Sequence, residues 1–404
     1  MNLRGRVRRW IVCWRQHRAS GASGHLTISA PYPETVFPLL RAARQIPGEP
    51  GTEANRVPVW FMRQAGRSLP EYKAIRGEGT ILHVIADTDR ATEITLQPVR
   101  RYGVDAAILY SDIVTPIWAV DFGIDIVPGI GPMCEHPFSG AADLDRLRPL
   151  EPDVDLPYQA ETIKNVVADG GVPLIGFSGG PFTLASYLIE GRPSRTYTKV
   201  KALMFSDPEL WHQLCELLAD IAIATLRAQV EAGASMVQLF DSWAGALRPE
   251  HYREFVLPHS SRILEGVADL NVPRTHFGIN TGELLSDMAD AGADVVGVDW
   301  RTPLSTARQR TGGRVALQGN LDPALTTGTW EVMEREVRRV LADNDGHPED
   351  ALTRDELLDN MMLYWLTASG ASSARLYWES FSSFSAGECT KPTAVSTFPK
   401  EIIK

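Results

Sequence analysis

The chain has 404 residues, of which 44% are hydrophobic and 22% are charged, and its formal net charge is −10. This composition is typical of a soluble globular protein with enough apolar material for one large α/β barrel or two ordinary domains. The acidic balance repels phosphate backbones and argues against a nucleic-acid partner, and the lack of a long apolar run argues against a membrane partner.

The first 33 residues are basic. They contain six arginines, between Arg4 and Arg18, and no acidic residue. An Arg-rich, acid-poor segment is typical of an organelle transit peptide, but a disordered extension, or translated sequence upstream of the true start, has the same composition. We therefore predict a basic, disordered N-terminal extension over residues 1–33, with a transit peptide as the alternative.

Seven short apolar runs follow, separated by longer helical patterns. The runs are Val57–Phe61, Ala106–Tyr110, Pro173–Phe177, Met236–Phe240, Arg274–Gly278, Val295–Val298 and Val315–Gly319. The clearest helix is Pro208–Ala232, because Asp207 provides an N-cap before a proline and Gly233 provides a stop. Strand–helix alternation predicts a parallel sheet covered by helices. Seven or eight such units favour a (β/α)8 barrel of the TIM type, and no GxGxxG motif supports a dinucleotide-binding sheet.

Polar residues follow the runs, where a barrel places its chemistry. Arg63, Gln64 and Arg67 follow the first run, and two guanidinium groups suit carboxylate ligands, although a surface salt-bridge pair has the same composition. Asp112 follows the second run and is either a helix N-cap or an anion that attracts N–H donors or a developing cation. Tyr187 and Ser242 follow the third and fourth runs, as substrate contacts or as structural residues.

The four cysteines Cys13, Cys134, Cys215 and Cys389 are far apart and form no CxxC pair. A disulfide framework and a thiolate zinc site are therefore not expected. A reducing, cytoplasmic location fits this cysteine pattern.

Several long motifs in order resemble those of uroporphyrinogen decarboxylases, from about Pro58 to about Asp343. They are Pro58–Tyr72 (PVWFMRQAGRSLPEY), Asp105–Asp112 (DAAILYSD), Pro173–Thr183 (PLIGFSGGPFT), Gln238–Gly245 (QLFDSWAG), Gly297–Trp300 (GVDW) and Gln318–Pro323 (QGNLDP). The resemblance implies a (β/α)8 barrel, usually a homodimer, in haem and porphyrin biosynthesis. The family converts the four acetate side chains of uroporphyrinogen III to methyl groups, giving coproporphyrinogen III, without metal or organic cofactor.

The same resemblance assigns site residues. Those expected to bind the substrate are Arg63, Gln64, Ala65, Gly66, Arg67, Arg76, Asp112, Tyr187 and Ser242. Asp112 and Arg63 are the expected catalytic residues. Loss of carbon dioxide from an acetate needs an electron sink, which a pyrrole protonated on a ring carbon supplies. We expect Asp112 to stabilise that cation and gather the pyrrole N–H groups, while Arg63 and Arg67 orient the carboxylates. The ring proton could come from an arginine or from a bound water.

The end of the chain departs from the family pattern. The family's eighth strand ends in Asn-Leu-Gly-His-Gly, whose His contacts substrate, and this motif is absent. Residues 345–399 instead resemble a fragment of an epoxide hydrolase, in which Tyr377 would match a lid tyrosine without its partners. We predict a barrel over residues 34–343 that lacks its eighth β/α unit or replaces it, followed by an atypical tail over 344–404. An open barrel exposes strand edges, so lowered stability and activity are expected.

Two other functions remain open at this point. A related corrinoid (cobalamin) methyltransferase would share the fold, but that class typically holds zinc with His and Cys, and the isolated Cys134, Cys215 and Cys389 argue against it. An inactive or impaired porphyrinogen-binding barrel would follow from the altered C-terminus.

Overall fold

The computed structural model describes residues 37–45, 57–65 and 69–343. All of these residues belong to one compact unit. The predicted N-terminal extension, the C-terminal tail with Tyr377, and the site candidates Gly66 and Arg67 lie outside the described residues. In the described part of the chain, no helix is long and apolar enough to cross a membrane.

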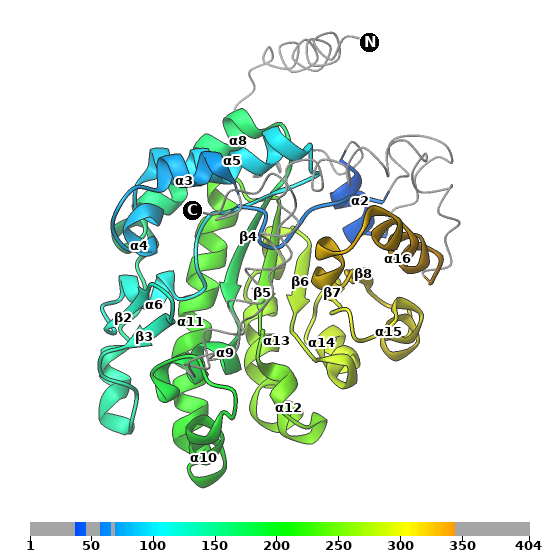
Figure 1. The fold of residues 1–404 in the computed structure, drawn as a ribbon. Coiled ribbons are helices and arrows are strands. Elements are labelled where there is room, and N and C mark those ends of the chain that lie inside the picture. The colour runs from blue at the N-terminus through cyan, green and yellow to red at the C-terminus, as the bar shows by residue number, and fades with distance from the viewer. Residues whose placement is uncertain (1–36, 46–56, 66–68, 344–404) are drawn as a thin grey trace, which may run out of the picture. The chain divides into compact units, whose positions relative to one another are not determined.

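Six strands form one parallel sheet, in the order β1-β4-β5-β6-β7-β8 (Figure 1). They are β1 (Ala107–Ile108), β4 (Leu174–Gly179), β5 (Met236–Phe240), β6 (Arg274–Phe277), β7 (Val295–Gly297) and β8 (Ala316–Gln318). Each strand pairs in parallel with the next one along the chain. A doubly wound sheet reverses its strand order at a switch point, and this sheet does not. The predicted parallel α/β architecture is therefore confirmed for these six runs.

The sheet curls on itself. Gln318 on β8 donates from Nε2 to Oε1 of Gln238 on β5 at 3.1 Å, although two strands separate β5 from β8. Such a contact requires the concave face to roll inward, as in a barrel. That face is filled by aromatic rings: Phe240 packs edge-on against Phe177 at 5.4 Å and against Phe277 at 6.0 Å between centroids.

The first predicted strand, Val57–Phe61, is wrong as a strand. Val59 accepts a backbone hydrogen bond from Asp105 at 2.8 Å, but its own N–H donates to the Asp105 carboxylate at 2.6 Å. A side chain thus replaces the partner strand, and no continuous ladder forms. Trp60 and Met62 still pack against the apolar cluster inside the sheet, so the segment occupies the expected place beside β1.

Helices cover the outer face of the sheet. The longest is α11 (Pro208–Ala232), which lies beside β4 (Figure 1) and matches the predicted helix. Asp207 accepts from the Leu210 N–H at 3.1 Å, which confirms the predicted N-cap. Fully buried α11 side chains such as Trp211 and Leu214 pack in the main core cluster. Each such leucine stabilises the fold by about 2 kcal/mol.

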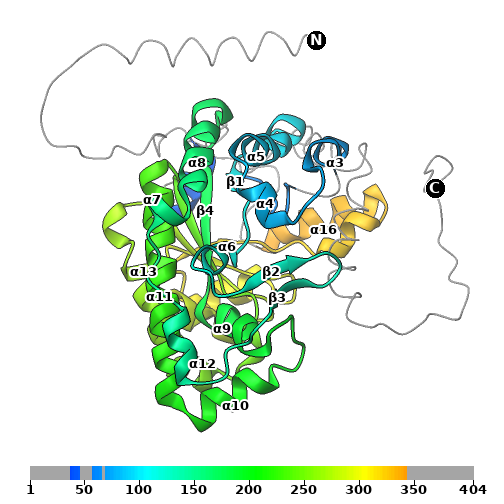
Figure 2. The ribbon, with the colours of Figure 1, turned by 90° about the vertical axis from the view of Figure 1, so that its left-hand side faces the viewer.

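The other helices are shorter. Those of the first half are α3 (Pro70–Arg76), α4 (Ile81–Ile85), α5 (Thr88–Tyr102), α6 (Thr115–Ala119), α7 (Pro152–Asp155), α8 (Pro157–Gly170), α9 (Pro181–Glu190) and α10 (Thr198–Ser206). Those of the second half are α12 (Pro249–Phe255), α13 (Leu257–Glu265), α14 (Leu285–Asp290), α15 (Leu304–Thr311) and α16 (Trp330–Asp343). Figure 2 shows α5 and α8 side by side, which agrees with their contacts.

The amino-terminal ends of the strands are covered by α2 (Pro38–Ala43) and the turn after it. Arg44 donates to the Asn271 carbonyl, just before β6, at 2.7 Å. Gln45 donates to the Arg314 carbonyl, just before β8, at 3.4 Å. The opposite, carboxyl ends are left for the polar residues that follow each strand.

Two features concern the edges. A separate antiparallel hairpin, β2 (Ile124–Val127) with β3 (Gly131–Cys134), follows α6 and was not predicted. Among the described residues, β8 has no strand on its outer edge. The residues after Asp343 lie outside the described ranges, so the expectation that the eighth unit is missing or replaced stays a prediction.

Candidate active site

Three of the predicted site residues influence one another electrostatically. Arg63 follows the segment beside β1, Asp112 follows β1, and Tyr187 lies on α9. Burial raises the pKa of Asp112, and the N–H of Val114 and the positive charge of Arg63 oppose that rise. Burial also raises the pKa of Tyr187, the Asp112 charge adds to it, and Arg63 opposes it. The fold thus brings together residues that are 124 positions apart between Arg63 and Tyr187.

Asp112 sits in a tight turn that leads into α6. Its Oδ1 accepts from the Val114 N–H at 3.0 Å, and its carbonyl accepts from the Thr115 N–H at 3.1 Å. Its own N–H donates to the Thr115 hydroxyl at 3.2 Å. The sequence left a capping role and a site role open, and the structure gives the residue a turn-forming role while leaving the carboxylate half-buried.

Arg63 is exposed, and its position is set by the two neighbours that tie its loop to β1. The fully buried Gln64 side chain donates to the Ala106 carbonyl at 2.9 Å and accepts from the Phe61 N–H at 3.1 Å. Asp105 holds Val59 through both backbone groups of that residue. Both amide atoms of the Gln64 side chain are engaged by backbone groups, so this side chain holds the loop to β1, and the expected contact of Gln64 with substrate stays a prediction.

Aromatic rings pack together beside Tyr187. The Tyr187 and Trp243 rings lie 4.3 Å apart between centroids, and Tyr197 approaches Trp243 at 5.4 Å. The Trp243 N–H donates to the Thr183 hydroxyl at 3.0 Å, which fixes the loop after β5 against α9. Ser242, in the same loop, is half-buried, and its carbonyl accepts from the Ile279 N–H at 3.3 Å.

Asp241, directly after β5, was noted in the sequence only as part of a motif. It is fully buried, and Oδ1 accepts from the Thr183 hydroxyl at 2.6 Å and from the Thr183 N–H at 2.9 Å. Its Oδ2 has no hydrogen-bond partner among the described residues. Burial raises the pKa of Asp241 to about 6, against the lowering effect of Thr183. A Cβ on Gly180 would lie 2.5 Å from the Asp241 Cβ, so only glycine fits there.

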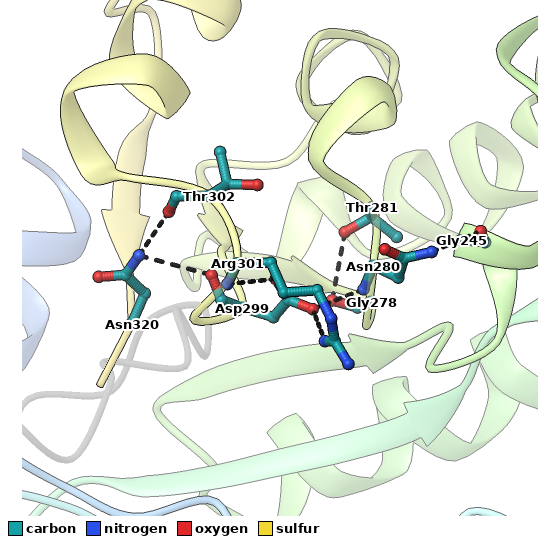
Figure 3. A network of polar contacts seen from close by, with 8 residues as sticks. All are labelled: Gly245, Gly278, Asn280, Thr281, Asp299, Arg301, Thr302 and Asn320. Atoms are coloured by element: carbon teal, nitrogen blue, oxygen red, sulfur yellow. Dashed lines mark hydrogen bonds and ion pairs between the residues drawn. The ribbon is translucent and has the colours of Figure 1, made fainter. Parts of the chain in front are cut away.

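The strand ends of β6, β7 and β8 carry a denser polar network (Figure 3). The almost fully buried Asp299 side chain accepts from the Asn280 N–H at 2.6 Å and from the Arg301 N–H at 3.0 Å. The Arg301 guanidinium also donates to Asp299, at 2.5 Å. Asn320, after β8, donates to the Thr302 carbonyl at 2.5 Å and to the Asp299 carbonyl at 3.4 Å. This network binds the ends of three neighbouring strands to one another.

Arg76 is not brought to the other candidates by any contact of the described residues. It ends α3, and its guanidinium donates to the Gly77 carbonyl at 2.9 Å and to the Gly79 carbonyl at 3.0 Å. Ala65 is half-buried beside Gln64.

No group of three or more His, Cys, Asp or Glu side chains that could hold a metal ion occurs in the described ranges. Cys134 and Cys215 are buried free thiols. Burial raises the pKa of Cys134 to about 12, so this cysteine is a neutral thiol at physiological pH.

The fold and these motifs recur in known proteins. A methyltransferase from Methanosarcina mazei superposes with a TM-score of 0.62 at 19% identity, covering 84% of this chain and 98% of that chain, which supports the fold alone. The uroporphyrinogen decarboxylase of Salinispora tropica is 57% identical over 312 residues, covering 77% of this chain and 82% of the relative. That of Frankia casuarinae is 55% identical over 314 residues, covering 77% and 83%. The sequence model of the uroporphyrinogen decarboxylase family matches residues 39–350. The chain therefore belongs to the uroporphyrinogen decarboxylase family.

Proposed function

We propose that this chain decarboxylates the four acetate side chains of uroporphyrinogen III to give coproporphyrinogen III, in haem and porphyrin biosynthesis. The observation that carries the proposal is Asp112, a half-buried carboxylate at the end of β1 in the electrostatic range of Arg63, in a chain of this family. The other residues proposed to bind substrate are Gly66, Arg67, Arg76, Tyr187 and Ser242, together with the backbone at Gln64 and Ala65.

The role of Asp112 follows from where charge develops on the substrate during decarboxylation. A proton first adds to a ring carbon of the pyrrole, and the ring becomes an iminium cation. The bond between the acetate CH2 and its carboxylate then breaks, carbon dioxide leaves, and the electron pair neutralises the ring. A second protonation on the exocyclic carbon, with loss of the ring proton, completes the methyl group, so one proton is consumed for each carbon dioxide. Asp112 stabilises the cationic stage and accepts hydrogen bonds from the pyrrole N–H groups.

Two features of the site favour this role for Asp112. No ion pair joins it to Arg63 among the described residues, so its charge is not already neutralised by a hydrogen-bonded cation. Partial removal from water strengthens its attraction for a nearby cation. Arg63 in turn carries a fork of donors that fits a carboxylate.

The direct test is a turnover assay of the full-length chain with uroporphyrinogen III, with the porphyrins separated by their number of carboxylates. Wild type is expected to yield coproporphyrinogen, and Asp112→Asn is expected to lose about 10²–10³-fold in rate with an unchanged thermal midpoint. The replacement Asp169→Asn, on an exposed carboxylate of α8, is the matched control and is expected to retain full activity. Near-normal turnover by Asp112→Asn would exclude the proposed role.

Because the C-terminal sequence departs from the family pattern, substrate binding without turnover is a second outcome to test for. A chain that binds uroporphyrin but releases no carbon dioxide would be an impaired, porphyrinogen-binding member of the family. Binding is measured by quenching of porphyrin fluorescence, independently of turnover. Restoring the family's Asn-Leu-Gly-His-Gly segment after Asp343 would then be expected to restore activity.

We also propose that the protein is a cytoplasmic homodimer that needs no metal or organic cofactor. The buried free thiols of Cys134 and Cys215 are compatible with a reducing compartment. Sedimentation equilibrium tests the dimer, and activity that survives prolonged dialysis against a chelator tests the absence of a metal requirement.

A further inference from the structure

Arg301 lies just after β7, at the same edge of the sheet as Asp112. Parallel strands put their carboxyl ends at one edge, and β7 is separated from β1 by β4, β5 and β6 in the strand order. In a sheet that curls into a barrel, the carboxyl ends of the strands surround an opening, the mouth of the barrel. Strands this far apart lie on opposite sides of the mouth. Arg301 therefore belongs to the half of the mouth that faces Arg63 and Asp112.

The Arg301 guanidinium is held in place by two contacts, but most of its N–H groups make no hydrogen bond within the described residues. It donates one hydrogen bond, from Nη1 to Asp299, and it stacks over the Trp300 ring with its central carbon 4.1 Å from the centroid. Nε and Nη2 make no hydrogen bond within the described residues, and the side chain is 44% exposed. Four of its five N–H donors thus remain available to a ligand.

Asp299 does not need the guanidinium in order to be satisfied. The backbone N–H groups of Asn280 and Arg301 both donate to its carboxylate (Figure 3). Asp299 therefore acts as an anchor that fixes the direction of the Arg301 side chain. A preorganised arginine loses less conformational entropy when it binds a carboxylate.

We propose that Arg301 binds a carboxylate of the substrate on the side of the mouth opposite Asp112, with Trp300 holding the guanidinium plane in place. The inference rests on the proposed function, because it needs a macrocycle whose acidic side chains point outward in every direction. Asp112 accepts hydrogen bonds from the N–H groups at the centre of such a ligand, and Arg63 binds the carboxylates on one side. A cation on the opposite side completes the match to the ligand.

The chain contains a matched control. Arg253 on α12 donates from Nε to the buried Asp287 on α14 at 2.8 Å and is 53% exposed, so it forms the same kind of pair between two helices. Arg301→Gln and Arg253→Gln therefore remove the same charge beside a buried carboxylate. Only Arg301→Gln removes it from the loop that follows β7.

The test measures KM and kcat for uroporphyrinogen III and the fluorescence-detected Kd for uroporphyrin on full-length variants. Arg301→Gln is expected to raise KM and Kd about tenfold with kcat within about twofold, as for loss of one charge-assisted contact. Arg253→Gln is expected to match wild type. Arg301→Lys, which keeps the charge, is expected to recover most of the affinity and to separate binding from folding if Arg301→Gln is unstable.

The outcomes separate the two proposals. If wild type neither binds uroporphyrin nor releases carbon dioxide, the proposed function fails. If wild type does both while Arg301→Gln and Arg301→Lys bind as tightly as Arg253→Gln, only the role of Arg301 fails. A lowered thermal midpoint with unchanged Kd would also overturn it, since that result would make Arg301 a structural partner of Asp299.

Discussion

The carboxylates at the ends of β1 and β5 are held differently from the one at the end of β7. Asp112 and Asp241 accept hydrogen bonds only from neutral donors among the described residues, and burial raises the pKa of each. Asp299 is paired with the guanidinium of Arg301 and with two backbone N–H groups. A carboxylate that is withdrawn from water without a cationic partner costs stability, and the half-buried Asp112 can still be reached by a ligand, whereas a paired carboxylate contributes to structure. The first half of the mouth is therefore suited to chemistry and the second half to positioning.

The sharpest test of this comparison replaces one carboxylate from each half. Asp112→Asn is expected to remove about 10²–10³-fold of the turnover and to leave stability unchanged. Asp299→Asn is expected to lower the free energy of unfolding by about 2 kcal/mol, because a buried charge-assisted bond is lost. Steady-state kinetics and chemical denaturation of both variants check this. If Asp299→Asn instead lost turnover at full stability, the two halves would not differ in the way described.

Asp241 offers a test through pH. Its pKa is about 6 in the folded state and 3.8 in the reference state, so the folded protein holds its proton more tightly. The sign follows: the stability contribution of this group is greatest at low pH and falls as pH rises from about 4 to about 6. The total difference is about 3 kcal/mol. About 2 kcal/mol of it falls between pH 4.5 and pH 7. Denaturation of wild type and Asp241→Asn at these two pH values measures this part, and an equal change in the free energy of unfolding of both proteins would contradict it.

The two hydrogen bonds of the Gln64 side chain are expected to contribute both to stability and to the placement of Arg63. Gln64→Met removes one buried and one partly buried hydrogen bond and should cost about 2 kcal/mol of stability. It should also raise KM, because the loop that carries Arg63 is no longer held to Ala106. Gln45→Met, which removes one exposed amide contact, is the control and should change stability by less than about 0.5 kcal/mol. Loss of stability without any change in KM would limit Gln64 to a structural role.

The smallest expected effect is a shift of the acid limb of the pH–rate profile. Protonated Asp112 cannot stabilise a cation, so kcat/KM should fall as pH drops through its raised pKa. Arg63 lowers that pKa, so Arg63→Met should move the limb to higher pH. Arg253→Met, which removes a guanidinium that pairs with Asp287 and not one that acts on Asp112, should leave the limb in place. A limb that does not move would mean that Asp112 is not the group that controls it.

Local patterns were enough to predict much of the fold. The helix Pro208–Ala232 was predicted at both ends because its N-cap, its first-turn proline and its terminal glycine act within a few residues of one another. Six of the seven predicted strands are present, because strands buried on both faces are nearly continuous apolar runs. The positions of Asp112 after β1 and of Tyr187 on the helix after β4 followed from the same pattern.

The tertiary structure decided what those residues touch. Val57–Phe61 is not a strand because the carboxylate of Asp105, 46 residues away, takes its N–H in place of a partner strand. The Gln64 side chain bonds to the Ala106 carbonyl, and the Arg301 guanidinium bonds to the Asp299 carboxylate. Both contacts form because packing of the whole sheet places Ala106 and Asp299 within reach. Periodicity and caps are short-range properties that a sequence determines by itself. The partner of a polar side chain depends on long-range hydrogen bonds, which only the folded chain brings within reach.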